Sequence, residues 1–173
     1  MTQKPVRRSD RAISQSDAIN LLSSANYGVL STVGEDGRPY AIPLSFVFHD
    51  RIIYLHCAKE GRKLDNLRSN PAVSFCVVGH TKVLPGEFAT EYESAIASGT
   101  ASLISGDEKQ EALIKFLEKY SPDFMKQGLK FITGSINKVE IIRIDVNEIS
   151  GKVKRGGFKP EVQQRYDASV TAP

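Results

Sequence analysis

The chain is poor in residues that build metal and disulfide sites. Its 173 residues include no tryptophan, three histidines and two cysteines. Cys57 and Cys76 lie 19 residues apart without a CxxC spacing, which indicates neither a zinc site nor a disulfide framework. We therefore predict no metal site, and we expect both cysteines to be small buried side chains. The sequence also lacks GxGxxG, GxxxxGK[ST], GxSxG and HExxH patterns, so dinucleotide, P-loop, serine-hydrolase and zinc-protease sites are without support.

Long apolar runs and a strong charge bias are missing as well. No stretch reaches the roughly 18 apolar residues of a membrane span, and basic residues interrupt the N-terminus where a signal peptide would need an apolar run. A net charge of +3 is too small and too evenly spread to indicate a nucleic-acid protein. We expect a soluble, cytoplasmic protein with no nucleic-acid or membrane partner.

What the sequence does contain is a series of short apolar runs separated by turns. With 40% hydrophobic and 25% charged residues, the composition suits one globular domain, which we place at 12–155. Residues 1–11 are expected to form an N-terminal arm and 156–173 a flexible tail. Loops are expected at 34–37 and 79–90, and strands are expected at 27–33, 39–48, 52–57, 72–78, 92–104 and 138–146.

The connections between these strands indicate an antiparallel fold. The links among the first three are too short for crossovers, which favours a mainly β, closed antiparallel barrel with flanking helices. Pro43 cannot donate to a ladder, so its strand should be at an edge, bulged or bent. Gly99 should mark a bend or bulge. Helices are expected to begin after Ser14 and Ser105, each in a capping-box spacing, and shorter ones at 64–68 and 123–132.

A basic corner follows the third strand. Arg62 and Lys63 would lie in the first turn of the short helix, where cations are unfavourable unless an anion is near. Helix N–H groups and two cations together make a possible phosphate seat. An exposed surface turn is the alternative. His56 ends the strand just before this corner, where it could handle a proton, hydrogen-bond a cofactor, or simply bond the backbone.

Three segments of the chain carry a family resemblance, namely RPYAIPL at 38–44, YLHCAxxGRKLD at 54–65 and NPxVSF at 70–75. In this order they resemble the FMN-binding split-barrel flavoproteins, which are the pyridoxamine 5'-phosphate oxidase-like proteins. Within this superfamily they are most similar to the nitroimidazole-reductase-like branch. YESA at 92–95 and EIIRI at 140–144 continue the resemblance. It covers about residues 12–155 and implies an antiparallel split β-barrel.

The resemblance also implies a set of FMN contacts. Arg62 and Lys63 match the pair that holds the FMN phosphate, and Ser94 matches a contact from the second subunit of a homodimer with FMN at its interface. The remaining implied contacts come from the strand along the flavin ring and from the strand end beside it: Tyr40, Ile42, Pro43, Leu44, His56, Cys57 and Ala58. His56 is also the candidate catalytic residue.

Departures from the family pattern narrow the expected activity. Ser94 is shorter than the glutamine of the true oxidases, and their C-terminal arginine and tryptophan signature is not found, so vitamin B6 oxidation is not expected. We expect an FMN-dependent oxidoreductase that reduces a small electrophile such as a nitroaromatic or quinone. The alternatives are a flavin-binding sensor or storage protein without turnover, and the same barrel with haem or a deazaflavin.

Overall fold

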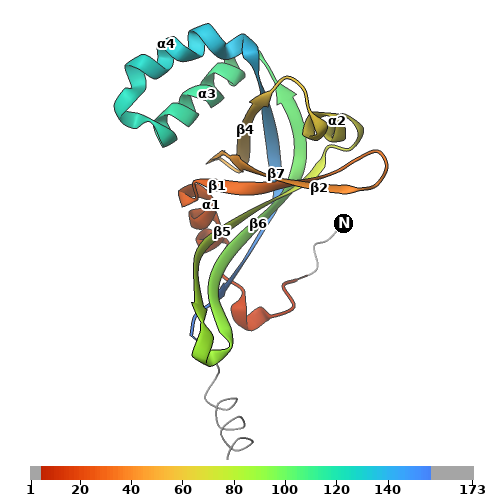
Figure 1. Cartoon of the computed structure of the whole chain (residues 1–173), viewed down its shortest axis with the longest axis vertical. Coiled ribbons are helices and arrows are strands. Elements are labelled where there is room, and N and C mark those ends of the chain that lie inside the picture. The colour runs from red at the N-terminus through yellow and green to blue at the C-terminus, as the bar shows by residue number, and fades with distance from the viewer. Residues whose placement is uncertain (1–4, 157–173) are drawn as a thin grey trace, which may run out of the picture.

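The computed structural model describes residues 5–156, which form one antiparallel sheet with helices around it (Figure 1). The seven strands are β1 (Tyr27–Val33), β2 (Pro39–Ser45), β3 (Val47–His49), β4 (Ile52–Ala58), β5 (Ala72–Leu84), β6 (Ala89–Ile104) and β7 (Val139–Lys154). The α-helices are α1 (Gln15–Ser24), α2 (Arg62–Ser69), α3 (Gly106–Tyr120) and α4 (Met125–Ser135). Short 3₁₀ turns lie at Ser9–Arg11, Pro85–Glu87, Pro122–Phe124 and Ile136–Lys138.

The strand order explains why the sheet closes on itself. The order is β2-β1-β5-β6-β7-β4-β3, so β2 and β3 are the two edges of the sheet. Only Phe46 separates these two strands in the chain, and therefore the edges must come together. The sheet curls into a barrel whose wall is split between its edge strands β2 and β3, as expected for a split barrel.

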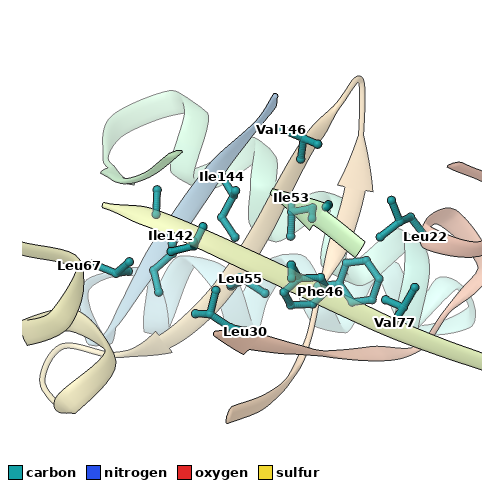
Figure 2. Close-up of a cluster of buried hydrophobic side chains, with 14 of the residues drawn as sticks. Leu22, Leu30, Phe46, Ile53, Leu55, Leu67, Val77, Ile142, Ile144 and Val146 are labelled. Atoms are coloured by element: carbon teal, nitrogen blue, oxygen red, sulfur yellow. The ribbon is translucent and has the colours of Figure 1, made fainter. Parts of the chain in front are cut away.

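One main core fills the barrel. Figure 2 shows side chains from strands β1, β4, β5 and β7 meeting with Leu22 of α1 and Leu67 of α2 around Phe46. Phe46 itself is fully buried and its ring lies 4.7 Å from that of Phe75. The residue that joins the two edges is thus also a centre of the core, and burial of its ring favours closure.

Local sequence signals account for several element boundaries. The Ser14 hydroxyl accepts a hydrogen bond from the Asp17 N–H at 3.0 Å and caps α1. Pro43 lies on the edge strand β2, where a missing N–H donor is tolerated. A register shift between Ser98 and Gly99 confirms the predicted irregularity of β6, and a side chain at Gly99 would clash with the Asp145 carbonyl.

Other predictions were wrong in detail. The segment 79–90 is not a loop, because β5 and β6 continue as a hairpin that projects from the barrel (Figure 1). The expected strand 39–48 is two strands that break at Phe46, and the last strand runs on to Lys154. Ser105 precedes α3, but its side chain makes no capping hydrogen bond.

The two chain ends are only partly described. Within the expected arm the structure has the Ser9–Arg11 turn, and Ala12 forms a β-bridge with Lys152. The expected tail lies, apart from Gly156, outside the described residues.

The segment between β6 and β7 forms a helical hairpin that lies over one end of the barrel (Figure 1). The Arg143 guanidinium on β7 pairs with Glu108 on α3, and the Tyr54 hydroxyl donates to the same carboxylate at 3.3 Å. Ala112 and Phe116 of α3 are buried with Ile141 of β7 in a second, smaller core cluster. Helix α3 is therefore fixed to the sheet by both charge and packing.

Candidate functional site

The basic corner is the N-terminus of α2, as predicted. Gly61 precedes the helix with φ 128° and supplies no side-chain cap, and no atom would contact a Cβ built there. The Arg62 guanidinium lies over the Tyr40 ring of β2, 4.7 Å from its centroid. Two of the predicted residues, 22 positions apart in the chain, are thus brought together. First-turn N–H groups, the helix dipole and a cation face the same open corner, which suits an anion.

Lys63 follows Arg62 in the first turn of α2. It is half-buried and close enough to Cys57 for its charge to act on that thiol. Burial raises the pKa of the Cys57 thiol, and the Lys63 ammonium opposes part of the rise. Cys57 is therefore a neutral, buried side chain, as expected, whereas Cys76 is only partly buried.

The body of α2 holds this corner in place. Leu64 and Leu67 are buried in the main core, and the Asn66 side-chain amide donates to the Thr32 hydroxyl of β1 at 2.9 Å. Both partners of this bond are buried, so its loss would leave an unsatisfied polar group. The position of Arg62 and Lys63 relative to the sheet is accordingly well defined.

A polar hollow of about 590 Å³ opens beside Arg62. Arg38 and Asp36 lie on its far side, 3.6 Å apart, in the turn between β1 and β2. Its other lining residues are Gly34, Glu35, Asp65, Asn66 and Ser69. The mixture of both charge signs suits a polar, hydrogen-bonding group.

Strand β2 alternates between core and surface. Ile42 and Leu44 are half-buried and pack against the main core, whereas Pro43 is exposed. Since β2 pairs only with β1, its other edge faces the split. The backbone groups on that edge have no strand partner, and a backbone contact along β2 is the kind that the resemblance implied.

His56 and Ala58 point outward from the end of β4. Much of His56 is open to solvent, but its ring packs edge-on against Phe116 at 4.8 Å. This partial burial lowers the pKa of His56, so the imidazole is neutral near pH 7. His56 lies at an apolar hollow of about 470 Å³ under the α3–α4 hairpin.

The aromatic side of this hollow was not predicted. Phe116, Tyr120 and Phe131 line it, and the sequence assigned the helix around Phe116 only a core stripe. The sequence did hold one signal for it: the rings at positions 116 and 120 are four residues apart and so share one helix face, which could have indicated an aromatic surface.

Ser94 lies far from the other predicted residues within one chain. His56 pairs with Ile141 of β7, and Ile141 pairs with Ile104 of β6. Ser94 is ten positions back along β6 from Ile104. In an extended strand this is a run of about 33 Å. Within one chain Ser94 is therefore remote from His56, and only the resemblance relates it to the other predicted residues.

Two kinds of feature are absent from residues 5–156. No three His, Cys, Asp or Glu side chains are grouped in a way that could hold a metal ion. No helix of that range has both the length and the apolar character needed to cross a membrane.

A split antiparallel barrel with a basic helix start beside its edge strand defines the class of the FMN-binding split-barrel fold. The family described as pyridoxamine 5'-phosphate oxidase matches residues 14–153, and the chain belongs to this family. The resemblance seen in the sequence is thereby confirmed at the level of family and fold. No curated protein sequence matched.

Solved structures agree on the fold. A candidate 5-nitroimidazole antibiotic resistance protein from Bacteroides thetaiotaomicron superposes with a TM-score of 0.69 at 22% identity, over 82% of this chain and 86% of that one. The flavocytochrome Anf3 from Azotobacter vinelandii gives 0.78 at 20% identity, over 93% and 78%. An FAD and haem binding protein from Mycobacterium smegmatis gives 0.65 at 16% identity, over 92% and 79%.

Proposed function

We propose that the chain binds FMN and reduces a small electrophilic acceptor such as a nitroaromatic or a quinone. The observation that carries the proposal is the contact between Arg62 and Tyr40 at an uncapped helix start. It supplies an anion seat directly beside the edge strand on which the family resemblance places a flavin ring. Family membership and the flavin-binding names of two structural neighbours support the proposal.

The residues present fit the proposed cofactor. Arg62, Lys63 and the first-turn N–H groups of α2 would hold the phosphate. The unpaired edge of β2 would offer backbone groups to the ring, and Cys57 and Ala58 would lie beside it at the end of β4. When bound, a flavin supplies hydride acceptance from NADH or NADPH and delivery of two electrons to an acceptor. The protein's own part is to anchor the phosphate, to orient the flavin ring and to shield the bound cofactor.

The proposal includes a homodimer with FMN at its interface. The outer face of β5 and β6 carries exposed apolar side chains next to Ser94, with Val78 55% and Ile96 40% exposed. Exposed apolar patches of this kind are typical of protein interfaces. A second copy covering this face would place its Ser94 at the interface, where the resemblance puts a contact to the cofactor of the other subunit.

Two experiments test the cofactor and the reaction. A visible spectrum and mass analysis of the released cofactor distinguish FMN from FAD, haem and deazaflavin. Stopped-flow reduction by NADH or NADPH, followed by mixing with a nitroaromatic, separates a reductase from a flavin-binding sensor or storage protein. The reductase proposal fails if neither nucleotide reduces the bound flavin, or if no acceptor reoxidises it faster than oxygen does.

Replacing Lys63 by alanine tests the phosphate seat. Lys63→Ala should weaken FMN binding by about 1.5–3 kcal/mol, because a charge-assisted contact to the phosphate is lost. Isothermal titration calorimetry measures the change. Lys126→Ala, which removes an exposed cation from α4, is the matched control and should leave FMN affinity unchanged. If the two variants bind FMN equally well, the phosphate is held elsewhere.

A further inference from the structure

We propose that the apolar hollow under the α3–α4 hairpin binds the acceptor, and that it selects flat, uncharged aromatic molecules. The inference rests on the proposed function, since it names the substrate class of that same site. It adds residues of α3 and α4 as determinants of specificity, a part of the chain to which neither the sequence motifs nor the family match assigned a role.

The lining of the hollow contains no Asp, Glu, Lys or Arg. It consists of Ser45, His56, Leu113, Phe116, Leu117, Tyr120, Ser121, Phe131, Ile132, Ser135, Ile136 and Val139. The nearby Lys119 ammonium does not line the hollow; it donates to the carbonyls of Ala25 and Phe46 at 2.7 and 3.0 Å and lies 5.4 Å from the centroid of the Tyr120 ring. A charged ligand would lose its hydration here without gaining an ion pair, whereas a neutral apolar ligand is favoured.

Aromatic rings give the hollow its shape. Phe116 and Tyr120 stack with centroids 5.9 Å apart and 18° between their planes, and His56 meets Phe116 edge-on. Hydrogen bonds between the Tyr120 hydroxyl and the Phe46 backbone fix that ring. Phe131 of α4 also lines the hollow and is 73% exposed, so a flat ligand would cover a large apolar surface that water now contacts.

Strand β2 connects this hollow with the anion seat. Arg38, just before the strand, lines the polar hollow beside Arg62, and Ser45, its last residue, lines the apolar one. The seven residues of β2 span about 20 Å. A cofactor that lies along β2 with its phosphate at Arg62 would therefore extend toward the apolar hollow, where an acceptor would meet its ring.

A pair of similar ligands tests the charge preference. The purified full chain, with the cofactor it retains, is dialysed to equilibrium against 4-nitroacetophenone or 4-nitrobenzoate, which have nearly the same shape and differ in charge. We expect the neutral compound to bind about tenfold more tightly or better, because the carboxylate would be desolvated without a partner. Equal affinities would overturn the inference.

Two exposed phenylalanines of the same hairpin provide a variant and its control. Phe131→Asp should weaken binding of 4-nitroacetophenone about tenfold, because an apolar wall is replaced by a charge. Phe124→Asp makes the same change at a residue that is 61% exposed and does not line the hollow, and it should have no effect. Equal effects of the two substitutions would overturn the inference.

The inference and the proposed function can fail separately. If the full chain binds the neutral compound in the predicted way but no reduced flavin transfers electrons to it, the reductase proposal is wrong and the binding site stands. If turnover occurs and its KM is the same in the wild type and Phe131→Asp, the reductase proposal stands and the acceptor binds elsewhere.

Discussion

At the scale of single residues, His56 is both partly exposed to solvent and packed against an aromatic ring. It is open to solvent on one side, and on the other its ring contacts Phe116 in an apolar environment. Tyr120 is the only other titratable side chain among the described residues that line this hollow, and no carboxylate is among them to favour the imidazolium. The folded protein therefore favours the neutral imidazole over the imidazolium. A neutral imidazole can form a hydrogen bond with a neutral ligand.

This lowered pKa predicts a specific dependence of stability on pH. Because the folded-state pKa of His56 lies below the unfolded value, the unfolded chain binds a proton first as the pH falls. The stabilising contribution should be present above the unfolded pKa of about 6.5 and should be lost below it. Urea unfolding at about pH 7.5 and about pH 5.5 measures the effect. His56→Gln should lose less stability than the wild type over this range, and equal losses would contradict the assignment.

The sequence predicted part of the site at this scale. Arg62 and Lys63 could be placed at a helix start because a basic pair there is a local pattern, whereas Tyr40 came only from the family resemblance. The environment of His56 could not, because its partner Phe116 is 60 positions away and belongs to a helix whose docking depends on Glu108 and Arg143. The place of Phe131 in the hollow could not be predicted, because the sequence does not show what surrounds an exposed phenylalanine.

At the scale of elements, the C-terminal end of α3 holds the barrel closed at its seam. The Tyr120 hydroxyl accepts from the Phe46 N–H at 2.9 Å and donates to the carbonyl of Phe46 or of Asn26, both at 2.7 Å. Phe46 is the residue between the two edge strands, and Asn26 precedes β1. One side chain thus satisfies backbone groups that the break between β2 and β3 leaves without ladder partners.

Removing that hydroxyl should destabilise the fold. Tyr120→Phe leaves the ring stacked on Phe116 but takes away the partner of the Phe46 N–H, which should cost about 1–3 kcal/mol. Chemical denaturation measures the change in the free energy of unfolding. Tyr27→Phe is the matched control, because Tyr27 is 64% exposed at the start of β1, and it should change stability by less than about 0.5 kcal/mol. Similar effects of the two variants would show that the seam does not depend on Tyr120.

Strands were predicted correctly where the pattern of apolar residues in the sequence reflects burial in the core. Strand β1 and the first part of β5 alternate between core and surface, β4 has three consecutive buried residues, and all three were found. Pro43 predicted an edge, bulged or bent strand, and β2 is an edge strand. The outer hairpin of β5 and β6 was missed because it projects beyond the core. Its residues after Val78 are mostly exposed, so they show no alternation, and Pro85 with Gly86 resembled a loop.

At the scale of the whole molecule, the exposed apolar face of β5 and β6 predicts self-association. Ile96→Asp should convert a dimer into a monomer, because a charge buried without a partner opposes the interface. Sedimentation velocity measures the mass, and FMN affinity should fall in the same variant if Ser94 of a second copy completes the site. Phe124→Asp, at an exposed position between α3 and α4, should stay dimeric. A wild type that is monomeric at micromolar concentration would contradict the proposed assembly.

The position of β7 in the sheet has a consequence for the order in which the chain can fold. This strand lies between β6 and β4 and pairs with β4 through residues 139–145, so synthesis must reach about residue 146 before the two halves of the sheet can join. Until then the nascent chain exposes two long unpaired edges, which are sites of aggregation. A chain that ends before β7 would keep every residue of the anion seat and would still be unable to build a closed barrel around it. Slow, late closure is the expected kinetic signature of pairing between strands so distant in sequence.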